Sequence, residues 1–259
     1  MDILQELADY AKLRVKKAKE EISLEEIKEK ALSLPKGNFP FIKALQKDEI
    51  SFICECKKAS PSKGIIAKDF PYLEIAKAYA EGGADAISVL TEPKWFLGNN
   101  EFLREIAKIV KVPVLRKDFT VDPYMIYEAK VLGASAILLI CKILSDKELK
   151  EFHNIAEDLG LNAIVEAHDE EEIQRAIACG AKIIGVNNRN LTDFSVDTSN
   201  SAKLRKKVPK DILFIAESGI KTKDDVDVAQ AIGANAVLIG ETLMRSKNIK
   251  ETLAMLGGK

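Results

Sequence analysis

The chain has 259 residues, of which 47% are hydrophobic and 31% are charged. Its 39 Lys and Arg residues nearly balance its 40 Asp and Glu residues, which argues against a general binder of nucleic acid or of anionic membranes. Apolar runs such as 134–141 stop well short of a membrane span, and the N-terminal stretch lacks the apolar core of a signal peptide, so we expect a cytoplasmic protein.

The first 47 residues precede the first predicted strand. Helical periodicity runs over 2–20, 23–33 and, more briefly, 40–46, with Pro35, Gly37 and Pro40 interrupting the pattern. The repeating units that follow do not include this extension. We therefore expect it to cap one end of the fold or to line a ligand site.

The stretch 52-FICECKKASPSKG-64 begins like a buried strand and ends in charges. Alternation with period 2 places Glu55 and Lys57 on one face and Cys54 and Cys56 on the other. All four cysteines of the chain lie in apolar surroundings, which predicts reduced, buried thiols and no metal site.

A repeat organises the rest of the chain. Four segments have Gly-Ala after a helix-like stretch and then an apolar strand, at a spacing of roughly 50 residues that fits a βαβα unit: 82-GGADAISVL, 132-LGASAILLI, 179-CGAKIIGV and 232-IGANAVLIG. Three further apolar runs lie between them: 112-VPVLRKDF, 161-LNAIVEA and 211-DILFIAESG. Residues 51–57 complete the set of eight strands. This alternation predicts a single (β/α)8 barrel domain over residues 1–259, including the helical extension 1–47. An open doubly wound sheet is the alternative.

Several predicted strands end in polar residues. In a (β/α)8 barrel the carboxyl ends of the strands form the rim of the active site. Beyond Glu55 and Lys57, the polar residues at these ends are Arg116, Lys117, Asp118, Glu166, Asn187, Asn188, Glu217 and Ser218. Burying charges costs several kcal/mol unless they are paired, so this set indicates a site that transfers protons and holds anions.

Only two histidines are present, so catalysis would rest mainly on lysine and glutamate. His153 falls in a helical pattern, and we expect it at the surface. His168 closely follows a strand and could approach a site, but the sequence assigns it no role.

Glycines follow the last two predicted strands. Ser218-Gly219-Ile220 and Gly240-Glu241 lie where barrels of this kind usually hold a phosphate, between backbone N–H groups and a helix N-terminus. The side chain of Glu241 must then point away from the phosphate. We expect Lys57 or Arg189 to add positive charge on the other side.

Six stretches occur in a specific order: FICECKKASPSKG, VLRKDF, AIVEAH, GVNNRNL, AESGI and LIGETLMR. As an ordered set they resemble the indole-3-glycerol-phosphate synthase family of tryptophan biosynthesis, over essentially the whole chain. The resemblance implies a carboxy-lyase that converts 1-(2-carboxyphenylamino)-1-deoxyribulose 5-phosphate into indole-3-glycerol phosphate, carbon dioxide and water. It implies no metal or organic cofactor, a phosphorylated small-molecule substrate, no nucleic-acid or membrane partner, and a monomer.

The resemblance also implies roles for the polar residues. Lys117 would be the general acid on the C2′ oxygen, and Glu166 the general base, mainly in dehydration. Lys57 would hold the carboxylate and could also donate protons, with Glu55 orienting it. Asn187 would position hydroxyl groups, and Glu217 and Ser218 would line the mouth.

The substrate-binding residues implied by the resemblance form two groups. Arg189 and the N–H groups near Gly219 and Gly240 would serve the phosphate, beside Glu241. The E-x-K-x-x-S-P-S stretch contributes Ser60, and the wall around the anthranilate ring would comprise Pro61, Phe96, Phe119, Leu138, Leu191 and Leu238.

Ring closure needs a cation to protonate a carbonyl oxygen, and we expect burial and neighbouring positive charge to lower the pKa of the lysine toward neutrality. The division of acid work between Lys57 and Lys117 stays open. One alternative is another phosphate-binding barrel enzyme such as phosphoribosylanthranilate isomerase, against which the Glu and Lys of the first strand argue. The other is a barrel that binds a sugar phosphate without catalysis.

Overall fold

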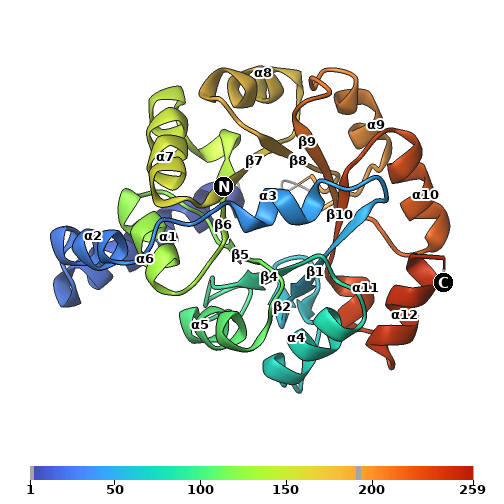
Figure 1. Ribbon diagram of the computed structural model, residues 1–259, viewed down its shortest axis with the longest axis horizontal. Helices are drawn as coiled ribbons and strands as arrows, with labels where there is room; N and C mark the ends of the chain where they lie inside the picture. Colours follow the sequence, from blue (N-terminus) through green and yellow to red (C-terminus); the bar gives the residue numbers. More distant parts are fainter. Residues whose placement is uncertain (1–2, 191–193, 259) are drawn as a thin grey trace.

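Within residues 3–190 and 194–258, which the computed structural model describes, eight parallel strands close into a barrel (Figure 1). The barrel strands are β1 (Ser51–Cys56), β4 (Ala86–Leu90), β5 (Val114–Lys117), β6 (Ala136–Ile140), β7 (Asn162–Ala167), β8 (Ile183–Asn187), β9 (Leu213–Glu217) and β10 (Ala236–Ile239). Neighbours along the chain pair in parallel, and β10 pairs with β1 to close the barrel. The predicted (β/α)8 architecture is confirmed.

Helices connect the strands and surround the barrel (Figure 1). They are α4 (Tyr72–Glu81), α5 (Asn100–Ile109), α6 (Pro123–Val131), η1 (Cys141–Ile143), α7 (Asp146–Leu159), α8 (Glu170–Cys179), α9 (Ser199–Arg205), α10 (Lys223–Ala231), α11 (Glu241–Met244) and α12 (Ile249–Leu256). Local sequence sets where they start: the side chains of Ser145 and Thr222, for example, close capping boxes at α7 and α10. Of the helices described, none combines the length and apolar character that crossing a membrane would take.

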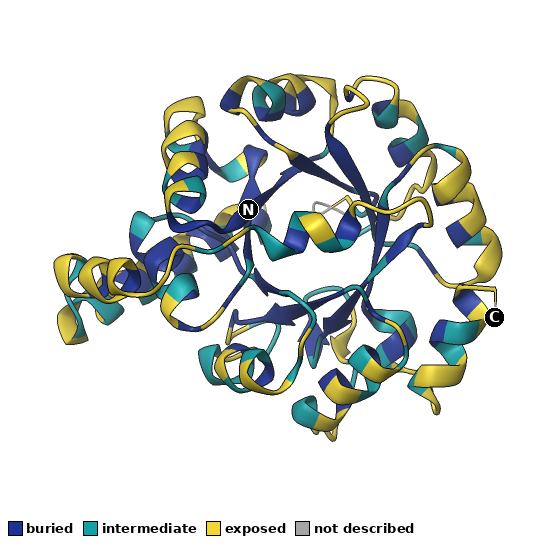
Figure 2. Cartoon of the chain, viewed as in Figure 1, coloured by how far each residue is buried: buried dark blue, intermediate teal, exposed yellow. Residues whose placement is uncertain are grey.

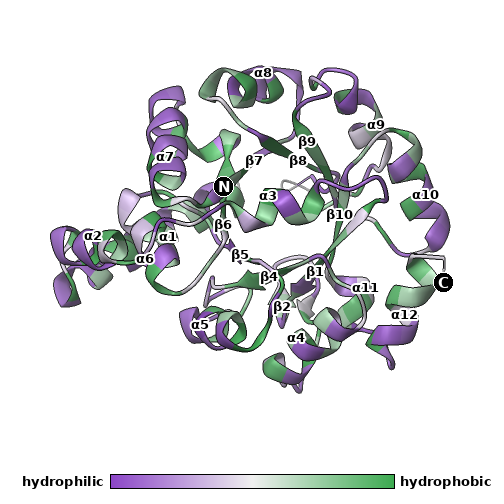
Figure 3. Ribbon diagram, viewed as in Figure 1, coloured by the Kyte–Doolittle hydropathy of each residue, from purple (hydrophilic) through white to green (hydrophobic). Residues whose placement is uncertain are grey.

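Two apolar layers hold the barrel together, one inside it and one between strands and helices (Figures 2 and 3). In β1, Ile53 belongs to the inner layer, whereas Cys54 and Cys56 pack in the outer layer, as the alternation predicts. All four cysteines lie in the described part of the chain, and each is a buried free thiol. Glu55 and Lys57, which alternate with these cysteines, therefore point toward the inside of the barrel at its mouth.

His153 corrects one expectation. It was predicted at the surface, but it is only 5% exposed. Its position on α7 matches the apolar stripe that also buries Leu149, Phe152 and Ala156, spaced three and four residues apart. Burial lowers the pKa of His153, so the ring is neutral at physiological pH.

The N-terminal extension contacts both ends of the barrel. It comprises α1 (Ile3–Glu21), α2 (Leu24–Ser33) and α3 (Pro40–Leu45). The helix α1 is fixed near the carboxyl ends of the strands by Arg14, whose guanidinium donates two hydrogen bonds to the Asp118 carboxylate at 2.6 and 3.0 Å. Lys19 adds an ion pair with Asp122, at 2.7 Å.

The short helix α3 lies across the opposite opening of the barrel (Figure 1). Phe41 and Leu45 are fully buried and belong to the same apolar cluster as the barrel interior. The backbone N–H of Ile42 donates to the side-chain oxygen of Asn162, at the start of β7, over 3.0 Å. The extension was expected to cap one end or line the site, and it does both.

Candidate active site

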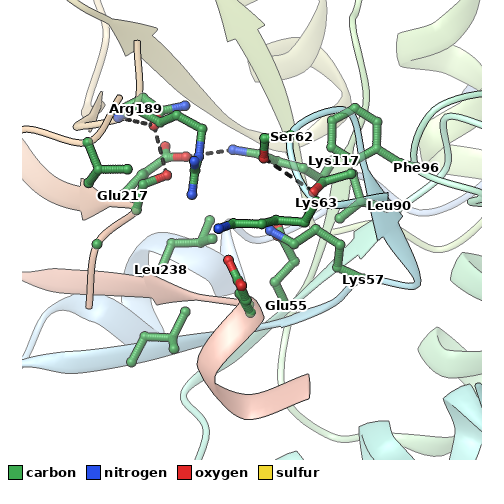
Figure 4. A pocket seen from close by; sticks show the side chains of 18 of the residues that line it. Glu55, Lys57, Ser62, Lys63, Leu90, Phe96, Lys117, Arg189, Glu217 and Leu238 are labelled. Carbon is green, nitrogen blue, oxygen red and sulfur yellow. Dashed lines mark hydrogen bonds and ion pairs between the residues drawn. The ribbon is translucent and has the colours of Figure 1, made fainter. Parts of the chain in front are cut away.

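A cavity of ≈ 710 Å³ opens at the carboxyl ends of the barrel strands, within the usual range of ~300–1,000 Å³ for small-molecule sites. Basic, acidic and apolar side chains from strands and loops reach into it (Figure 4). Seventeen predicted site residues line this cavity: Glu55, Lys57, Ser60, Pro61, Phe96, Lys117, Phe119, Leu138, Glu166, Asn187, Arg189, Glu217, Ser218, Gly219, Leu238, Gly240 and Glu241. The remaining predicted residue, Leu191, lies outside the described residues.

Strand alternation decides which polar residues face the cavity. Lys117 points inward from the end of β5, whereas its neighbour Arg116 points outward and donates to Asn100 on α5 over 3.0 Å. Asn187 likewise faces the cavity from β8, whereas the side chain of Asn188 accepts from the Ser201 hydroxyl at 2.8 Å. Of the ten polar residues predicted at the strand ends, Arg116 and Asn188 therefore support the fold instead of lining the cavity.

Lys117 lies between two buried carboxylates. Its Nζ is 2.6 Å from Glu217 Oε2 and 3.4 Å from Glu166 Oε2. The carboxylate side chains are each 2% exposed and the lysine 14%. Because β5, β7 and β9 alternate around the barrel, these three side chains meet at its centre from separate directions.

The charge state of Lys117 corrects a second expectation. Burial by itself lowers the pKa of the lysine, but the carboxylates of Glu217, Glu166 and Glu55 outweigh it and raise the pKa above its ordinary value. The prediction that neighbouring positive charge would bring this pKa toward neutrality is wrong for the free site. Lys117 is therefore a fully charged proton donor at neutral pH.

The two carboxylates have opposite pKa shifts. Burial raises the pKa of Glu217 to about 7 despite the attraction of Lys117, with repulsion from Glu166 adding to the effect. Burial also opposes ionisation of Glu166, but Lys117, His168 and Asn187 outweigh it and lower its pKa to about 2. Carboxyl pairs driven apart in this way are typical of sites that divide acid and base work.

The raised pKa of Glu217 predicts a pH dependence of stability. Its pKa rises from an ordinary 4.5 to about 7 on folding, so its contribution to the free energy of unfolding falls as pH rises through this window. Glu166 titrates below the window, since its pKa is lowered. We expect Glu217→Gln to gain stability relative to the natural chain between pH 5 and pH 8, measured by urea unfolding. If the free energy of unfolding of Glu217→Gln relative to the natural chain were the same at pH 5 and at pH 8, this prediction would be wrong.

The pair that ends β1 has a defined geometry. Glu55 Oε1 is 3.0 Å from Lys57 Nζ, and the Ser88 hydroxyl donates to Glu55 Oε2 over 3.3 Å. Burial opposes ionisation of Glu55, but Lys57 and Lys117 outweigh it and lower the pKa of the carboxyl. Glu55 is 3% exposed, so it stands as a buried anion that fixes the ammonium of Lys57 at the cavity wall.

Gly185, in the middle of β8, makes room for Glu217. A Cβ at this position would lie 2.3 Å from Glu217 Oε1 and 3.1 Å from Ile164 Cγ2. We expect Gly185→Ala to displace the Glu217 carboxylate from Lys117 and to lower kcat by about 10²-fold, because misplacements near 1 Å can cost this much.

The control for Gly185→Ala is Gly257→Ala. Gly257 has φ −81°, and the nearest atom to an added Cβ there is 3.4 Å away. Steady-state kinetics and a melting curve of both variants would separate a site effect from a folding effect. Normal kcat in a folded Gly185→Ala variant would show that Glu217 can move without consequence.

A sharp turn and the start of α11 form the end of the cavity after β9 and β10. Ser218 and Gly219 are consecutive residues with positive φ, 67° and 90°, which turns the backbone sharply after Glu217. The Ser218 hydroxyl donates to Asn187 Oδ1 over 2.9 Å, which fixes the turn. Gly240 precedes α11, where a Cβ would lie 2.7 Å from Glu55 Oε1. Glu241 pairs with Arg245 at 3.0 Å, and both residues line the cavity.

An aromatic and aliphatic wall forms the other side of the cavity. The rings of Phe96 and Phe119 lie 6.0 Å apart between centroids, near Leu138 and Leu238. The buried carboxylate of Glu92 holds the loop that carries Phe96 by accepting from three successive backbone N–H groups of residues 94–96, at 2.7–2.9 Å.

Comparison with known proteins shows the family to which this chain belongs. The family model described as "Indole-3-glycerol phosphate synthase" matches residues 4–256. The chain belongs to the indole-3-glycerol phosphate synthase family.

Relatives named indole-3-glycerol phosphate synthase cover nearly the full length. The protein from Ruminiclostridium cellulolyticum is 54% identical over 257 residues, 99% of each chain. The protein from Endomicrobium trichonymphae is 57% identical over 255 residues, covering 98% of this chain and 99% of its own.

Solved structures that match this chain share little sequence identity with it, so they support only the fold. A chain of the tryptophan synthase a2b2 complex from Pyrococcus furiosus matches with a TM-score of 0.61 and 16% identity, over 82% of this chain and 98% of its own. Thiamine phosphate pyrophosphorylase from the same organism matches with a TM-score of 0.58 and 18% identity, over 82% and 95%.

In this member of the indole-3-glycerol phosphate synthase family, several cavity residues have no counterpart among the sequence predictions. Ile3 and Leu7 reach the cavity from α1, so the extension contributes to its lining. Lys63 reaches it from the hairpin formed by β2 (Ala59–Ser60) and β3 (Gly64–Ile65) (Figure 4). His168 lies behind Glu166, with Nε2 3.3 Å from Glu166 Oε1. Among the described residues of this family member, no three His, Cys, Asp or Glu side chains are grouped as a metal ion requires.

Proposed function

We propose that this enzyme converts 1-(2-carboxyphenylamino)-1-deoxyribulose 5-phosphate into indole-3-glycerol phosphate, with release of carbon dioxide and water. The observation that carries the proposal is the position of Lys117, a charged proton donor between Glu166 and Glu217 in a cavity with an apolar wall. Membership of the family supports the same reaction.

The first step closes the ring, and Lys117 is its acid. The aromatic carbon that bears the carboxylate attacks the C2′ carbonyl, and the ammonium of Lys117 protonates the oxygen as negative charge develops on it. Loss of carbon dioxide returns its bonding electrons to the ring and restores aromaticity. Glu217, whose raised pKa lets it hold a proton near neutrality, lies 2.6 Å from Lys117 and can return one to the amine.

The second step is dehydration, and Glu166 is its base. Removal of a proton from C1′ and departure of the C2′ hydroxyl as water create the double bond of the indole. Glu166 is ionised in the free site, as a base must be. Lys117, 3.4 Å from it, protonates the leaving hydroxyl. Asn187, whose Nδ2 is 3.4 Å from Glu166 Oε1, positions the hydroxyl groups of the substrate.

The remaining residues bind the substrate. Lys57, oriented by Glu55, holds the carboxylate of the substrate. The apolar wall of Pro61, Phe96, Phe119, Leu138 and Leu238 accepts the aromatic ring, with Ser60 beside it. The phosphate lies at the turn of Ser218 and Gly219 and at Gly240, where backbone N–H groups favour an anion. Arg189, at the cavity wall, supplies a cation.

One assay tests the proposal. Incubation of the purified protein with the synthetic substrate is expected to give the fluorescence of indole-glycerol and one equivalent of carbon dioxide. Turnover of phosphoribosylanthranilate instead would identify an isomerase. Saturable binding without any product would identify a barrel that binds a sugar phosphate without catalysis.

We further propose that the protein acts as a cytoplasmic monomer with one folding domain. All the described residues proposed to carry the reaction gather in one cavity at the end of a single barrel, which supports a monomer. Light scattering during size-exclusion chromatography is expected to give the mass of one chain, 28.6 kDa.

A further inference from the structure

His168 lies directly behind the carboxylate of Glu166, in the loop between β7 and α8. Its Nε2 is 3.3 Å from Glu166 Oε1, and its Nδ1 is 3.2 Å from Glu172 Oε2 on α8. The ring thus bridges a carboxylate that faces the cavity and one that does not. Its side chain is 18% exposed.

The local structure fixes this bridge. The backbone N–H of His168 donates to Glu172 Oε2 over 2.8 Å, and Asn200 donates to the His168 carbonyl over 3.2 Å. Glu172 is held in the first turn of α8, where its N–H donates to the side chain of the capping residue Asp169. The imidazole therefore has little freedom to turn away from Glu166.

We propose that His168 is a positioning residue, which as an imidazolium orients Glu166 and holds it in the ionised form. The inference rests on the proposed role of Glu166 as the base. Lys117 is closer to Glu217 than to Glu166, at 2.6 against 3.4 Å, and it gives up its charge when it protonates the substrate. His168 then supplies a cation that stays beside Glu166 through this step.

The charges around the ring support the assignment. Glu166 on β7 and Glu172 on α8 face it, Lys117 on β5 and Glu217 on β9 lie beyond Glu166, and the Cys141 thiol in η1 contacts the Glu172 carbonyl at 3.5 Å. Burial lowers the pKa of His168, but Glu166 and Glu172 outweigh it and raise the pKa to about 10. The ring then carries its charge throughout the neutral range.

The first test is a direct titration, which does not depend on activity. The chain contains only His153 and His168, so NMR of protein labelled at histidine resolves both rings. We expect His168 to stay doubly protonated above pH 8 while His153 remains neutral at pH 7. Glu166→Gln and Glu172→Gln should each lower the midpoint of His168 by ~1–3 pH units, since each removes an opposite charge. A midpoint for His168 below pH 7 in the natural chain would overturn the proposal.

The second test is the pH profile of kcat/KM for His168→Gln, which keeps a hydrogen-bond donor but loses the charge. We expect its acidic limb to move to higher pH by ~1–3 units, with His153→Gln as the matched control that should leave the profile unchanged. A profile of His168→Gln that superimposes on that of the natural chain would refute the assignment. If His168→Gln fails to fold, the titration of the natural chain still decides the proposal, because a His168 midpoint below pH 7 overturns it. Should the titration succeed in a protein without synthase activity, the electrostatic coupling stands and the proposed function fails.

Discussion

Lys117→Met is expected to abolish formation of indole-glycerol while leaving substrate binding largely intact. Methionine keeps the length and apolar stem of the side chain but removes the charge and the proton. Protonation of the C2′ oxygen matters in the transition state and adds little to ground-state binding, so kcat should fall by at least ~10²–10⁴ with KM nearly unchanged. Steady-state kinetics on the purified variant measures both values.

Lys57→Met is the matched comparison for this prediction. Lys57 lies in the same cavity but pairs with Glu55 and not with the carboxylates at the centre of the barrel. Its removal should weaken substrate binding as well as slow turnover, because its cation meets the substrate carboxylate in the ground state. If Lys117→Met keeps a near-normal kcat, Lys117 is not the acid, and Lys57 becomes the leading candidate.

Glu166→Gln is expected to slow dehydration far more than ring closure. Glutamine is close to isosteric and can keep contacts with Asn187 and His168, but it cannot accept the proton. Loss of a general base is typically worth ~10²–10⁴ in rate, so carbon dioxide should appear in single-turnover experiments well before indole, with an intermediate between them.

Glu217→Gln serves as the control for Glu166→Gln, since both carboxylates are equally buried and both contact Lys117. It leaves the proposed base in place and affects only the return of a proton to Lys117, so it should separate release of carbon dioxide from formation of indole far less than Glu166→Gln does. Equal slowing of both products in Glu166→Gln would mean that Glu166 acts before decarboxylation and that its assignment to dehydration is wrong.

Residues whose positions follow from strand alternation could be predicted from the sequence. The inward direction of Glu55, Lys117 and Glu217 depends only on a period of two and on the start of each strand. Gly-Ala before four strands, together with the apolar runs between them and residues 51–57, predicted eight strands and hence the barrel. The same alternation explains why Arg116 and Asn188, each adjacent to a cavity residue, turned out to face outward.

Contacts between distant segments could not be predicted in this way. The ion pair of Arg14 with Asp118 joins residues 104 positions apart, and no periodicity connects them. The pKa of Lys117 depends on three carboxylates from three other strands, so its direction needed their distances. The contact between His168 and Glu172 could have been predicted, because residues four apart at the start of a helix can meet. The burial of His153 could also have been predicted, since this residue falls on the apolar stripe of α7.

The contacts of the N-terminal extension with both ends of the barrel have a consequence during synthesis on the ribosome. The extension is made before the barrel strands, and the side chains that hold it, Asp118, Asp122 and Asn162, are made much later. At about 5–20 residues per second, α3 waits roughly 6–25 s for the start of β7. During that time Phe41 and Leu45 have no barrel interior to enter, and β1 still lacks its partner β10. The nascent chain therefore exposes the apolar residues of α3 and β1 while most of the barrel is still being made, when exposed apolar surface is prone to aggregate or to bind chaperones.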